Sequence, residues 1–137
     1  MTGIDLTTAT LDELEERIEQ SFWDTIGALY EIEQRKLYAP RYALFSDYLA
    51  AKWAHVCASE VTWRQYRASY IAYLEAHDVG VILHNEYAAR WLRKVEQNAR
   101  RVVLTLARDY SDDGVVRAND IIRASEVVSE VLETAAI

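Results

Sequence analysis

The sequence has few residues that break or crosslink a chain: its 137 residues include one cysteine, one proline and four glycines. A single cysteine, Cys57, excludes an internal disulfide, and no neighbouring cysteine or clustered histidine completes a metal site of known spacing. We expect Cys57 to face the core as a small apolar residue, the alternative being a reactive thiol. Scarce proline and glycine, with almost no alternation of β-branched residues, favour helices joined by short turns.

Long apolar runs are also missing. The longest, such as residues 79–83 and 102–106, stop far short of the roughly 18–20 apolar residues that cross a bilayer. The first residues lack both the basic start and the apolar stretch of a secretory signal. The sequence therefore predicts a cytoplasmic protein that does not span a membrane. Its 51% hydrophobic content suffices for the core of one helical domain over residues 1–137, with residues 1–9 expected to be flexible.

The usual markers of catalysis and metal binding are absent as well. The sequence has no glycine-rich phosphate loop and no HExxH, GxSxG or CxxC motif, and its three histidines, His55, His77 and His84, are scattered. The acidic turn around Gly114 lacks the spaced ligands of an EF-hand loop, so we expect a solvated turn there. These absences predict a protein that is not an enzyme and that uses no cofactor and no metal ion.

Charge is distributed unevenly along the chain. The net charge is −7, but residues 1–33 carry −8, residues 34–108 carry +6, and residues 109–137 carry −5. The basic middle also holds eleven of the fifteen aromatic residues. A basic aromatic segment is compatible with a nucleic-acid partner, whereas the two acidic ends would suit a basic protein partner.

Hydrophobic periodicity predicts an all-α fold, a compact bundle of about six helices. The first helix follows a capping box formed by Thr10 and Glu13, and its apolar stripe continues to about Leu37. A helix of about 26 residues would be long for a domain of this size, so it is either the seam of a homodimer or packs across its own chain. The other helices are expected over residues 44–58, from a Thr62 cap to 76, over 86–96 behind an Asn85 cap, over 98–110, and from Arg117 or Asn119 to 133.

Residues 44–76 have the layout of a helix-turn-helix, in which the second helix enters the major groove of DNA. Arg64, Gln65 and Arg67, with Ser69 further on, carry the donors that such a helix needs to read base edges. The candidates for phosphate contacts are the neighbouring cations Arg41, Lys52, Arg90, Arg93, Lys94, Arg100 and Arg101. The alternative is a solvated polar face opposite a tyrosine-rich core.

Four stretches of the sequence carry a family resemblance. They are ALYEIEQRKLY at residues 28–38, FSDYL with a following KW at residues 45–53, LHNEYAARWL at residues 83–92, and GVVRA at residues 114–118. Their content and order resemble those of ParB-like helix-turn-helix proteins of phages and plasmids, over about residues 26–132. His84 stands where that pattern has a proline, and Trp63 and Gln65 replace small or basic residues. The resemblance implies DNA binding.

Together, the residues and the resemblance predict a non-enzymatic protein of a mobile element that binds double-stranded DNA as a transcription or partition regulator. The alternative is an acidic protein-interaction module, an inhibitor or adaptor whose carboxylates bind a basic partner at the positions where that partner would bind phosphates.

Overall fold

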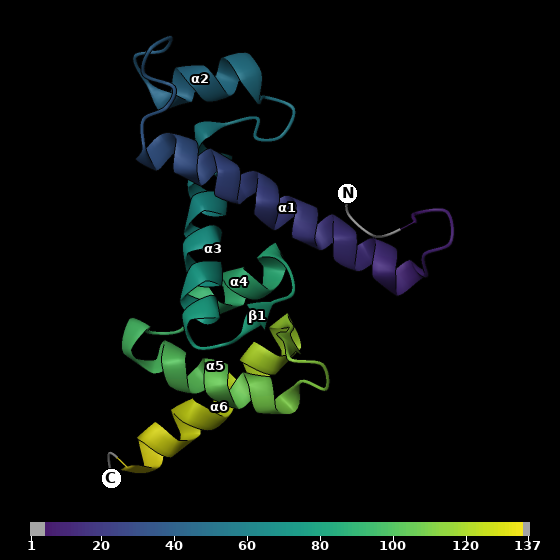
Figure 1. Ribbon diagram of the computed structural model, residues 1–137. Coiled ribbons are helices and arrows are strands. Elements are labelled where there is room, and N and C mark those ends of the chain that lie inside the picture. Colours follow the sequence, from purple (N-terminus) through teal and green to yellow (C-terminus); the bar gives the residue numbers. More distant parts are fainter. Residues whose placement is uncertain (1–4, 136–137) are drawn as a thin grey trace. The chain divides into compact units, whose positions relative to one another are not determined.

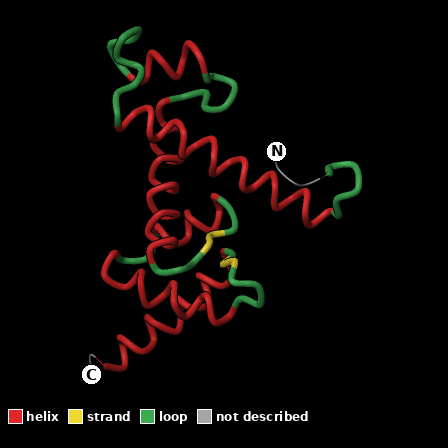
Figure 2. Tube along the Cα trace, in the orientation of Figure 1, coloured by secondary structure: helices red, strands yellow, loops and turns green. Residues whose placement is uncertain are grey.

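The computed structural model describes residues 5–135 and divides the chain into two compact units, residues 1–58 and 59–137. The described residues form six α-helices, one short 3-10 helix and two strands of two residues each (Figure 1). Helices dominate the trace in Figure 2, and the predicted all-α fold class is confirmed. Of the segment expected to be flexible, residues 1–4 lie outside the described residues. Residues 5–8 form a turn in which the Thr8 amide donates to the Asp5 carbonyl at 3.2 Å.

The first unit begins with the long helix α1 (Leu11–Gln34). The predicted capping box is confirmed, since the Glu13 amide donates to Thr10 Oγ1 at 3.2 Å and the Thr10 amide donates to Glu13 Oε1 at 2.9 Å. The helix ends three residues earlier than predicted. Lys36 takes a positive φ of 53°, and the Leu37 amide then reaches back to the Ile32 carbonyl at 3.0 Å. This is a Schellman ending, which here occurs without a glycine.

Helix α2 (Phe45–Lys52) is much shorter than the predicted helix over residues 44–58. The chain leaves the helix at Trp53, whose indole Nε1 donates to the Tyr48 hydroxyl at 2.8 Å. The apolar residues Trp53 and Val56 continue the helical spacing in the sequence, which explains the error. Cys57 is 3% exposed and faces the core, as expected.

The second unit contains α3 (Glu60–Asp78), β1 (Ile82–Leu83), α4 (Glu86–Arg93), the 3-10 helix η1 (Gln97–Ala99), α5 (Arg100–Tyr110), β2 (Val115–Val116) and α6 (Ala118–Ala135). Helix α4 packs against both α3 and α6, and α5 packs against α6. The two strands pair in parallel, with Ile82 opposite Val115. The sequence did not indicate them, because two residues are too few to show an alternating pattern. Among the fully buried side chains are Trp63, Leu83, Leu92, Leu104 and Ile121.

The caps of the second unit decide where its helices begin. Asn85 caps α4 as predicted, accepting from the Ala88 amide at 2.9 Å. Helix α3, however, is capped by Ser59, whose Oγ accepts from the Thr62 amide at 3.1 Å, so the predicted Thr62 cap is wrong. Helix α3 therefore begins earlier than predicted, and Arg64 and Gln65 lie in its second turn.

Candidate nucleic-acid interface

The groove-reading candidates lie on the N-terminal half of α3. Trp63 is buried and anchors this part of the helix, while Arg64 and Gln65 are exposed. Arg67 is half-buried and contacts other residues of the chain. Arg64 and Arg67 are three residues apart and share one side of the helix, whereas Gln65 lies on the opposite flank of Arg64 from Arg67. We call the surface centred on Arg64, with Gln65 on one flank and Arg67 on the other, the α3 basic face.

Ser69, the other donor considered on this helix, is not available to a ligand. Its side chain is fully buried, and its Oγ donates to Glu86 Oε2 at 2.7 Å and accepts from Arg93 Nη1 at 2.9 Å. The same Arg93 nitrogen donates to the Gln65 carbonyl at 3.3 Å. These bonds attach α4 to α3 and place the Arg93 guanidinium beside the α3 basic face.

Arg90 lies one turn before Arg93 on α4, but its charge is already matched. Its Nε donates to Glu86 Oε2 at 2.9 Å, and its Nη2 lies 2.6 Å from Glu86 Oε1. Hydrogen bonding to Glu86 raises the pKa of the Arg90 guanidinium above its ordinary value. A phosphate at this position would therefore compete with a two-point carboxylate contact.

Arg100 is held by the fold in a similar way. Its Nη1 donates to Glu75 Oε1 at 3.0 Å, its Nε to the Val95 carbonyl at 3.0 Å and its Nη2 to the Arg93 carbonyl at 3.2 Å. The side chain is only 16% exposed. Arg100 thus connects the C-terminal part of α3 to the segment that leads from α4 into α5, which is a structural role.

The remaining cations, Lys94, Arg101, Arg41 and Lys52, are exposed. Lys94 places its ammonium 4.1 Å from the centre of the Trp91 ring. Arg101 lines a hollow with Asp78 at the far end of α3, about 21 Å along the helix axis from the turn of Arg64 at 1.5 Å per residue. Arg41 and Lys52 belong to the first unit.

The structure therefore places Arg93 on the Gln65 flank of the α3 basic face, with Arg90 close by but paired, while Arg67 lies on the other flank. Sequence reasoning did not identify the carboxylates that neutralise two of the cations. The pairing of Arg90 with Glu86 was visible in the sequence as a spacing of four on one helix. The pairing of Arg100 with Glu75 was not, because those residues meet only through helix packing.

Among residues 5–135, no group of three or more histidine, cysteine, aspartate or glutamate side chains is placed to hold a metal ion. In the same part of the chain, no helix has the length and apolar character that crossing a bilayer requires.

No protein-family model, no curated protein and no solved structure matches the chain.

Proposed function

We propose that the chain binds double-stranded DNA without catalysing a reaction, and that the α3 basic face enters the major groove. The observation that carries the proposal is the exposure of Arg64 and Gln65 side by side on the N-terminal half of a helix that Trp63 anchors from its other side. The first turns of a reading helix are the part that meets base edges. The resemblance to ParB-like proteins of mobile elements, a family implied to bind DNA, supports the same function, that of a cytoplasmic transcription or partition regulator.

The side chains on this face have suitable chemistry for reading bases. A guanidinium such as that of Arg64 can donate two parallel hydrogen bonds to guanine, and a primary amide such as that of Gln65 can donate to and accept from adenine. Ile71, two turns along the helix from Arg64, is 40% exposed and offers an apolar contact for a thymine methyl group. Arg93, the last residue of α4, is the candidate for a phosphate contact beside the face, and Lys94, which follows it, is a further candidate.

The acid content of the chain sets a limit on DNA affinity. Residues 59–137 hold ten arginines and lysines against twelve aspartates and glutamates. Glu75 and Glu86 pair with arginines inside this unit, so part of its negative charge is compensated locally. We therefore expect binding that depends on a few contacts and weakens steeply as salt is added.

A second candidate function is supported by the first unit. The N-terminal half of α1 exposes Leu11 and Ile18 to 72% and 67% among the acidic side chains of Asp12, Glu15 and Glu16. Exposed apolar residues within an acidic helix suit a basic protein partner, which is the inhibitor or adaptor alternative. On this alternative the chain has no affinity for duplex DNA.

The two functions are separated by measuring fluorescence anisotropy of a labelled duplex at about 50 mM and about 200 mM salt. The DNA-binding proposal expects a saturable rise in anisotropy at the lower salt and a large loss of affinity at the higher salt. No change in anisotropy at the lower salt, even with excess protein, would reject the proposal and favour the interaction module.

A further inference from the structure

The C-terminal half of α6 has an apolar side that its own unit does not cover. The buried residues of α6, Ala118, Ile121 and Ala124, all lie in its first half. Further along, Val131 and Leu132 are 61% and 59% exposed. A helix in water gains most of its stability by packing an apolar side against a neighbour. The apolar residues in the second half of α6 are therefore suited to pack against a surface that lies outside this unit.

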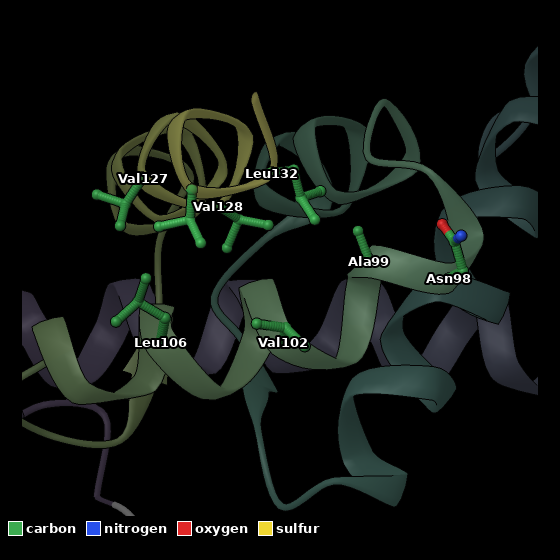
Figure 3. A pocket seen from close by; sticks show the side chains of 8 residues that line it. Asn98, Ala99, Val102, Leu106, Val127, Val128 and Leu132 are labelled. Carbon is green, nitrogen blue, oxygen red and sulfur yellow. The ribbon is translucent and has the colours of Figure 1, made fainter. Parts of the chain in front are cut away.

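These residues form one wall of a groove between α5 and α6, which we call the α5–α6 groove (Figure 3). Its volume is about 370 Å³, and most of its lining consists of Val102 and Leu106 from α5 and Val127, Val128, Val131 and Leu132 from α6. In Figure 3 the labelled side chains of the two helices face each other, Leu106 toward Val127 and Val128, and Ala99 toward Leu132. No charged side chain lines the groove, so its occupant must present an apolar surface.

The charges on the two helices indicate what this occupant is. Arg101 is exposed next to Val102 on α5, and Glu130 is exposed next to Val131 on α6. Because α5 and α6 run in opposite directions, both residues lie toward the same end of the groove. The α5 wall therefore carries a positive charge and the α6 wall a negative charge at the same position along the groove.

A second copy of the chain carries the same two charges, so a two-fold axis can place the unlike charges of the two copies opposite each other. A two-fold axis parallel to the groove would lay α5 of one copy on α6 of the other, so that Arg101 of each copy would meet Glu130 of its partner. The apolar residues of both grooves would then be covered at the centre, with a charge pair on each rim, the usual anatomy of a protein interface. We propose that the α5–α6 groove is the interface of a homodimer of this chain.

This proposal uses only α5 and α6 and does not depend on DNA binding. It also differs from the dimer seam along the first helix considered from the sequence. The two seams can be separated because each has an exposed apolar residue, Val131 in the groove and Ile18 on α1. Substituting either residue should leave the protomer folded, since neither is buried.

The test is the solution mass of the full chain by sedimentation equilibrium. The wild-type protein should approach twice the chain mass of 15.8 kDa as its concentration rises. Val131→Glu should weaken the dimer at least tenfold with an unchanged helical circular dichroism spectrum, and the control Ile18→Glu should leave the dimer unchanged.

A charge exchange tests the proposed geometry directly. Arg101→Glu and Glu130→Arg should each weaken the dimer, and the double variant should recover most of the loss because the pair is restored with its signs reversed. A wild-type protein that stays monomeric into the millimolar range would overturn the proposal. So would a dimer that Ile18→Glu dissociates and Val131→Glu does not, or a double variant no tighter than the single ones.

Discussion

Arg93 on α4 donates a hydrogen bond of 2.9 Å to the hydroxyl of Ser69, which is fully buried on α3. The Ser69 hydroxyl in turn donates a hydrogen bond to Glu86 Oε2, so one small side chain connects a cation and a carboxylate of the neighbouring helix. This relationship fixes how α4 lies on α3. It also determines which cation accompanies Arg64 and Gln65, because the same Arg93 nitrogen reaches the Gln65 carbonyl.

Removing the Ser69 hydroxyl should destabilise the second unit. Ser69→Ala would leave Glu86 and Arg93 without a shared partner in a buried position, which costs about 1–3 kcal/mol of unfolding free energy. Urea unfolding followed by circular dichroism measures this loss. The matched control is Ser129→Ala on the exposed side of α6, expected to change stability by less than about 0.5 kcal/mol. Equal effects of the two substitutions would contradict the role assigned to Ser69.

Arg100 should contribute to the stability of the fold and not to DNA binding. Arg100→Gln breaks the ion pair with Glu75 and leaves backbone carbonyls without their donor, so we expect a loss of about 1–3 kcal/mol in unfolding free energy. The folded variant should bind duplex DNA with nearly wild-type affinity, as anisotropy titration below the unfolding temperature would show. A stable Arg100→Gln protein with greatly reduced affinity would place Arg100 in the interface instead.

Substitutions at the start of α3 test whether Ser59 or Thr62 is the N-cap of this helix. Ser59→Ala should destabilise the protein by about 0.5–2 kcal/mol, because the Thr62 amide loses its acceptor. Thr62→Ala removes only a hydroxyl that bonds Ser59 Oγ at 3.0 Å on the surface and should cost less. Thermal unfolding of the two variants compares them directly. The opposite order would mean that Thr62 is the functional cap.

These contrasts show how far the sequence predicted the molecule. Helices with a long apolar period and a single candidate cap, such as α1 behind Thr10 and α4 behind Asn85, were predicted at their correct starting residues. The start of α3 was not, because Ser59 and Thr62 can both cap a helix and only the backbone conformation selects between them. The end of α2 was missed because Trp53 and Val56 keep a helical spacing after the helix has stopped.

The candidate site was only partly predictable for a similar reason. The sequence identifies Arg64 and Gln65 as donors, and burial of the adjacent Trp63 accounts for their exposure. Which cations are already neutralised depends on packing between helices, as with Arg100 and Glu75, and no spacing in the sequence encodes that contact.

An ion pair in the loop before α6 should make the stability of the fold slightly sensitive to acid. Hydrogen bonding to Arg117 lowers the pKa of the Asp113 carboxyl to about 2, with a further contribution from the Val115 amide. The unfolded chain therefore binds the proton more tightly, so this contact stabilises the fold above about pH 4 and is lost as the pH falls toward 2. Both side chains are about half exposed, so the effect should remain below about 1 kcal/mol.

Arg117→Gln should raise the pKa of Asp113 toward its ordinary value of 3.8, measured by NMR titration of the Asp113 carboxyl carbon. An unchanged midpoint in this variant would show that Arg117 is not the main cause of the shift.

The most direct test of the central claim compares Arg64→Gln with Arg35→Gln in DNA binding as a function of salt. Both substitutions remove one exposed positive charge, so any general electrostatic effect on affinity is matched. If α3 enters the groove, Arg64→Gln should weaken binding to a specific duplex by about 1–3 kcal/mol, and Arg35→Gln should have little effect. Equal, small losses in the two variants would contradict DNA recognition by α3.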